Sequence, residues 1–111
     1  MHITMVKKIG ADGAPCRKCA EVEQRLRDAG LLDRIDRVII ADERDPESEG
    51  MQVASRYGVD RAPFFVVEDD GGRVRLYTVY YRFLKEVLGE SAPEADEARE
   101  LLEQNPGLDY L

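Results

Sequence analysis

The chain has 111 residues, 43% of them hydrophobic, which is enough for one modest core but not for two. Its 16 basic and 23 acidic residues give a formal net charge of -7, and this balance argues against a surface that follows nucleic-acid phosphates. We therefore expect a soluble protein that does not bind nucleic acid.

Targeting and membrane segments are not expected from the sequence. Residues 1–8 lack a basic stretch followed by a long apolar one, and no later run approaches the roughly 18 apolar residues of a membrane span. We expect a cytoplasmic protein without membrane contact. In such a reducing compartment, Cys16 and Cys19 point to reactivity or metal binding, because a disulfide that closes so short a loop would add little stability to a fold.

Apolar patterns predict the elements of the first half of the chain. Residues 2–8 begin with alternating apolar side chains and predict a strand, followed by a loop over residues 10–15. Apolar residues spaced by three and four then predict a helix that opens at or beside Cys16 and ends near Gly30. Residues 38–41 form a β-branched run, which is typical of a strand covered on both faces.

The same reasoning predicts the elements that follow. A short amphipathic helix runs from Glu47 and ends at Gly58. Residues 64–67 and 74–79 predict two antiparallel strands joined by a glycine-containing turn, and a helix over residues 81–88 follows. The predicted order is β-α-β-α-β-β-α.

The last part of the chain differs in composition. Residues 91–111 contain six acidic residues and one basic residue, and Ser91 with Glu94 form the pattern of a capping box. We therefore predict a domain over residues 1–90 and an acidic helical extension over residues 91–111.

The spacing of Cys16 and Cys19 suits thiol exchange. A thiolate at a helix N-terminus is stabilised by unpaired amides and the helix dipole, and Arg17 and Lys18 add positive charge that tunes the thiol. Cys19 lies about one helical turn further on and can close on Cys16. A C-x-x-C pattern alone is compatible with redox chemistry or with metal binding.

These residues carry a resemblance to the thioredoxin superfamily. Cys16-Arg17-Lys18-Cys19 follows a predicted strand and opens a predicted helix, and Ala62-Pro63 directly precedes an apolar strand. Residues 56–67 are similar to the segment that ends a thioredoxin's second helix, makes a cis proline and enters the next strand. The resemblance covers roughly residues 2–89.

The resemblance implies a fold and a mechanism. The fold would be an α/β three-layer sandwich, a mixed four-stranded sheet with helices on both faces, extended by the C-terminal helix. Cys16 would be the nucleophile, Cys19 the resolving thiol, and Pro63 a cis proline facing the dithiol. The backbone of Ala62 would be offered to an extended substrate.

The implied activity is thiol–disulfide exchange with a protein or a small-molecule partner, without a cofactor. The direction of exchange and the oligomeric state stay open. The chain departs from thioredoxins because it has no tryptophan and no carboxylate near Gly10, where thioredoxins keep a buried acid. The group that deprotonates Cys19 therefore also stays open.

Two alternatives belong to other classes of protein. A Cu(I) carrier would use the two thiolates as ligands, whereas a structural zinc site, which needs four ligands, is not expected from two cysteines and one histidine. A cis proline beside the dithiol would leave little room for a metal, and we predict no metal site. The second alternative is an interaction module that works through its C-terminal segment without turnover.

Overall fold

The computed structural model describes residues 1–90 and 99–102. The chain divides into two compact units, Met1–Thr78 and Val79–Leu111. Among the described residues, no helix has the length and apolar character needed to cross a membrane.

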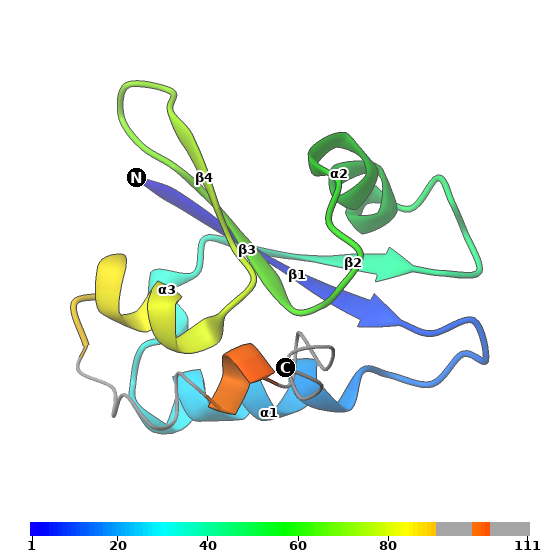
Figure 1. Cartoon of the computed structure of the whole chain (residues 1–111), viewed down its shortest axis with the longest axis horizontal. Coiled ribbons are helices and arrows are strands. Elements are labelled where there is room, and N and C mark those ends of the chain that lie inside the picture. Colours follow the sequence, from blue (N-terminus) through cyan, green and yellow to red (C-terminus); the bar gives the residue numbers. More distant parts are fainter. Residues whose placement is uncertain (91–98, 103–111) are drawn as a thin grey trace. The chain divides into compact units, whose positions relative to one another are not determined.

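The first unit is built on a mixed four-stranded sheet (Figure 1). Its strands are β1 (His2–Ile9), β2 (Arg37–Asp42), β3 (Phe64–Glu68) and β4 (Val74–Tyr77), in the spatial order β2-β1-β3-β4. β1 pairs with β2 in parallel, whereas the β1–β3 and β3–β4 pairs are antiparallel. The predicted α/β class and mixed four-stranded sheet are therefore confirmed.

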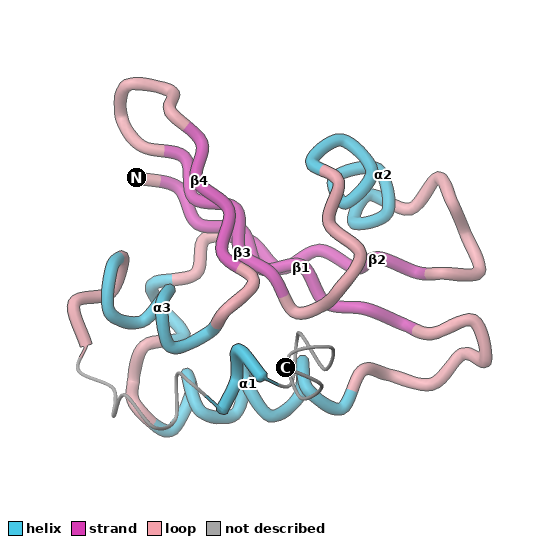
Figure 2. The backbone as a smooth tube through the Cα atoms, in the orientation of Figure 1, coloured by secondary structure: helices cyan, strands magenta, loops and turns pink. Residues whose placement is uncertain are grey.

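The helices α1 (Arg17–Asp28) and α2 (Glu49–Tyr57) lie on opposite faces of this sheet, as Figure 2 shows. Successive side chains of a strand point to opposite faces, so each face has its own apolar core. On the α2 face, a buried cluster meets partly buried apolar side chains of the helix. The cluster consists of Val6, Ile39, Ala41 and Phe64, and the helix contributes Met51, Val53 and Ala54.

Gly50 allows α2 to approach β2 closely. A Cβ atom at this position would overlap the backbone of Ile40 and Ala41, so no other residue fits without a shift of the helix. The turn before the helix is also fixed, because the Ser48 hydroxyl oxygen accepts a hydrogen bond of 3.0 Å from the Asp42 amide.

Three details differ from the sequence-based expectation. β2 is an edge strand on which Val38 and Ile40 are 45% and 37% exposed, so the expectation that both of its faces are covered is wrong. The short 3-10 helix η1 (Leu32–Arg34) between α1 and β2 was not expected. The predicted strand over residues 74–79 is shorter in the structure, because β4 ends at Tyr77.

The second unit contains α3 (Tyr80–Glu86). Its first amides need acceptors, and no side chain at the N-cap residue supplies one. Instead, the Glu100 carboxylate accepts hydrogen bonds of 2.6 and 3.0 Å from the amides of Tyr80 and Tyr81. Residues 99–102 are helical, whereas the rest of the predicted extension, including Ser91 and Glu94, lies outside the described residues.

Candidate functional site

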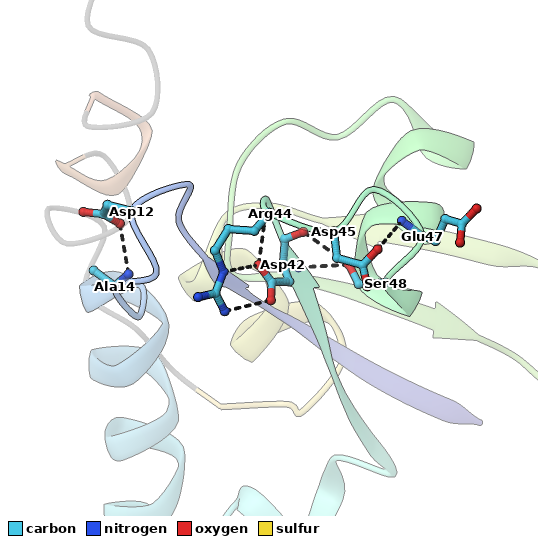
Figure 3. Close-up of polar contacts among 7 residues, drawn as sticks. All are labelled: Asp12, Ala14, Asp42, Arg44, Asp45, Glu47 and Ser48. Carbon is cyan, nitrogen blue, oxygen red and sulfur yellow. Dashed lines mark hydrogen bonds and ion pairs between the residues drawn. The ribbon is translucent and has the colours of Figure 1, made fainter.

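The loop before α1 is shaped by its own hydrogen bonds. The Gly10 amide donates to the Ala14 carbonyl at 2.9 Å, and the Asp12 carboxylate accepts from the Ala14 amide at 2.9 Å (Figure 3). At the end of the loop, the Cys16 amide donates to the Lys8 carbonyl at 3.1 Å. These contacts tie the start of α1 to the end of β1, and they fix where Cys16 stands.

The loop after β2 lies beside the loop that leads to Cys16. Figure 3 shows the Arg44 guanidinium on the Asp42 carboxylate, with both N–O distances at 3.0 Å. Hydrogen bonding and charge from Arg44 hold the pKa of Asp42 below its usual range. Gly13 has a φ of 82°, and a Cβ atom there would lie 2.9 Å from Arg44 Nη1. The positive φ favours glycine at this position, and the end of the Arg44 side chain lies against it.

Cys16 is the N-cap residue of α1. Its backbone is extended, with φ at -70° and ψ at 120°, and its Sγ accepts a hydrogen bond of 3.1 Å from the Cys19 amide. The first turn of α1 contains no acidic residue. The Cys16 sulfur therefore takes the place of an N-cap side-chain acceptor, at the N-terminus of α1 where the helix dipole has its positive end.

Cys19 is in a different environment. It is only 1% exposed, and burial, followed by its hydrogen bond with Cys16, raises the pKa of its thiol to about 12. The Lys8 backbone and the Lys7 charge act in the opposite direction on this pKa. Cys19 is therefore a neutral thiol near pH 7. The two cysteines also differ in exposure, because Cys16 is partly exposed and Cys19 is buried.

The Ala62–Pro63 bond is cis, as predicted. The Cys16 thiol faces this loop and donates to the Ala62 carbonyl, with an S–O distance of 3.9 Å. Residues 46 positions apart in the sequence are thus brought together at one site.

The structure places Arg17 and Lys18 as the first two residues of α1, where Arg17 is exposed and Lys18 half-buried. Their effect on Cys16 stays a prediction.

An ion pair beside Cys19 was not predicted from the sequence. Lys7 Nζ on β1 lies 2.9 Å from Glu23 Oε1 on α1, and the two side chains are 28% and 22% exposed. Alternation along β1 does place Lys7 on the face opposite Val6, and Glu23 follows Cys19 by four residues on α1. These two spacings were the only clue in the sequence to the ion pair. They were not enough to predict it, because two lysines at a strand end are usually solvent-exposed surface residues.

The donor set for a metal consists of the two thiols. Cys16 and Cys19 are not joined in a disulfide. Within residues 1–90 and 99–102, no three side chains of the His, Cys, Asp or Glu type gather as metal ligands would.

The site combines a partly exposed thiol at a helix N-terminus with a buried thiol one turn away. This arrangement can form a mixed disulfide at the first sulfur and release it at the second. Comparison with protein-family models, curated proteins and solved structures finds no match to this chain.

Proposed function

We propose that the chain is a thiol–disulfide oxidoreductase with a thioredoxin-like fold, acting on a protein or small-molecule disulfide in the cytoplasm. The observation that carries the proposal is the asymmetry of the two thiols. Cys16 is partly exposed and accepts a helix amide, whereas Cys19 is buried with a pKa of about 12. Exchange needs one thiol that attacks the substrate disulfide and a second thiol that resolves the mixed disulfide.

In the first step, the Cys16 thiolate attacks one sulfur of the substrate disulfide. The S–S bond of the substrate breaks, a Cys16–substrate disulfide forms, and the other substrate sulfur leaves as a thiolate. In the second step, Cys19 loses its proton and attacks Cys16 Sγ. This step forms the Cys16–Cys19 disulfide and releases the second substrate thiolate, so the substrate gains two electrons and two protons in total. An external thiol reductant then restores the pair.

Other residues of the site have supporting roles in this proposal. Arg17 and Lys18 add positive charge near the Cys16 thiolate. Ala62, whose carbonyl lies 3.9 Å from Cys16 Sγ, offers backbone to an extended substrate, and Pro63 follows it on the same loop. The order of elements and the position of Ala62 beside Cys16 support the thioredoxin-like assignment.

Reduction of insulin by dithiothreitol, followed by turbidity, tests the function. We expect the wild-type chain to accelerate the reaction, and the Cys16→Ser and Cys19→Ser variants to lose most of the acceleration. No acceleration by the wild type, together with stoichiometric Cu(I) binding that either substitution abolishes, would instead support the carrier alternative.

A further inference from the structure

A pocket of about 210 Å³ lies on the α2 face of the sheet, within the first unit. The start of β1 lines it with His2 and Thr4, and all three other strands contribute residues. The opposite wall is one side of α2, with Glu49, Val53, Arg56 and Tyr57. Among the described residues, the pocket shares none with the dithiol site, where Cys16 is tied to Lys8 near the other end of β1.

The floor of the pocket is mainly apolar and belongs to the sheet. Ile39 is 6% exposed and is part of the buried cluster on the α2 face. Val66 from β3 and Val53 from α2 are partly buried and pack against this cluster. An aliphatic group between the sheet and the helix would leave water on both sides, and its burial there is favourable.

Thr4 places one polar group in this floor. The residue is only 9% exposed, and it lies opposite Val66 in the β1–β3 register. Its hydroxyl has no hydrogen-bond partner within residues 1–90 and 99–102. The hydroxyl is not sealed off, because no fully enclosed side-chain oxygen or nitrogen of this part of the chain lacks a partner. It is therefore open to the pocket, where a ligand can supply the hydrogen bond.

The charged side chains at the pocket have opposite signs. Arg37 from β2 and Glu49 from α2 form an ion pair with each other. Arg56 on α2 and Glu68 on β3 also line the pocket, and neither has an ion-pair partner in the described part of the chain. His2 lies opposite Glu68 in the β1–β3 register, but no ion pair joins them. The helix thus offers an unpaired guanidinium, and the sheet an unpaired carboxylate.

We propose that this pocket binds a free α-amino acid with an aliphatic side chain. Arg56 holds the carboxylate, Glu68 holds the ammonium group, and the side chain lies against Ile39 and Val66. The Thr4 hydroxyl donates to a carboxylate oxygen. A zwitterion suits the pocket better than a single ion, because a single ion would be repelled by one of the two unpaired charges. The volume is below the roughly 300 Å³ at which pockets for drug-sized ligands begin, so a nucleotide or a flavin does not fit.

Three ligands with the same hydrocarbon test the proposal. L-Leucine carries both charges, isocaproate only the carboxylate, and isoamylamine only the ammonium group. We expect leucine to shift the amide NMR signals around Thr4 and Val53 of the full-length wild-type chain, and to bind about fivefold more tightly than either analogue. Glycine, which lacks the aliphatic side chain, should bind about tenfold more weakly than leucine. An analogue or glycine that binds as tightly as leucine, or no shift with leucine, would overturn the proposal.

Substitutions in the pocket test which residue holds which group. Arg56→Gln should weaken leucine and isocaproate about fivefold and leave isoamylamine unchanged, whereas Glu68→Gln should weaken only leucine and isoamylamine. Both side chains are exposed, so folding should not depend on them. Thr4→Val, which exchanges the hydroxyl for a methyl group, should weaken leucine about threefold. Arg34→Gln, at an exposed position of η1 outside the pocket, is the control and should keep all affinities. Leucine binding that is unchanged in the three pocket variants, or weakened equally in the control, contradicts the assignment.

Discussion

At Cys19, burial and a nearby lysine act in opposite directions on one proton. Burial is the main cause that raises the pKa of the thiol to about 12. The positive charge of Lys7 keeps this pKa below the value that burial alone would give. Lys7 is held by Glu23 at 2.9 Å, so its position relative to the buried thiol is fixed. In the proposed mechanism this lysine makes the second step easier, because Cys19 must lose its proton there.

Substitution of Lys7 tests this role. We expect Lys7→Met to raise the pKa of Cys19 further and to slow release of a mixed disulfide at Cys16 by about two- to tenfold. The measurement is the single-turnover rate of release, followed from pH 7 to 10. Lys8→Met is the matched control, because it keeps the Lys8 backbone and removes only a side chain directed to the other face. Equal slowing in both variants would contradict the role of Lys7.

The raised pKa also predicts how stability depends on pH. The folded protein keeps the Cys19 proton up to about pH 12, whereas the ordinary value is 9.0, so the folded state binds more protons in between. The stabilising contribution is complete below pH 9 and is lost as pH rises from 9 toward 12. Between pH 8 and 10, the free energy of unfolding of the wild type should fall by about 1 kcal/mol more than that of Cys19→Ala. Denaturant unfolding under reducing conditions measures this difference. Parallel pH profiles would contradict the burial account.

Among the elements, α2 depends on a single glycine. Gly50 faces the backbone of Ile40 and Ala41, and a Cβ atom has no room there. We expect Gly50→Ala to lower the free energy of unfolding by about 2 kcal/mol, since the helix must shift off β2. Gly71→Ala is the matched control, because a Cβ atom there meets only the Asp69 carboxylate, at 3.5 Å. Equal stability changes in the two variants, measured by urea unfolding, would show that close packing of α2 is not the cause.

The sequence predicts elements well where periodicity and composition agree. The run at β3 and the Asp-Asp-Gly-Gly turn give the antiparallel β3–β4 pair, and Gly58 ends α2 in the left-handed conformation, with φ at 68°. Exposure of Val38 and Ile40 could not be predicted in the same way. Whether a β-branched strand is central or at an edge depends on strand order, which is set by pairing between distant segments.

In the site, too, local sequence predicts some features, whereas others depend on contacts between distant segments. Local sequence places Cys16 and Cys19 on one helical turn, and family resemblance brings in Ala62 and Pro63. The Lys7–Glu23 pair joins a strand to a helix 16 residues later, so its existence depends on how α1 packs against the sheet. No local pattern distinguishes this lysine from its solvated neighbours.

For the whole molecule, the site residues lie in the first unit, Met1–Thr78, whereas most of the net charge lies elsewhere. Residues 91–111 carry -5 of the total charge of -7. Truncation after Glu90 should therefore leave a folded chain that still exchanges disulfides. It also removes Glu100, the acceptor for the Tyr80 and Tyr81 amides, which should lower stability by about 1 kcal/mol. Circular dichroism and the insulin assay check both, and an unfolded truncated chain would contradict the domain boundary.

The central claim is that the two thiols have different roles, and trapping with bis(2-hydroxyethyl) disulfide at pH 7 tests it most directly. Intact-mass spectrometry should show one mercaptoethanol adduct on Cys19→Ser, because no thiol remains to release it. Cys16→Ser should stay unmodified over the same time, since Cys19 is buried and burial, the largest cause of its raised pKa, is kept in this variant. Equal modification of both variants, or adducts on neither, would contradict the account.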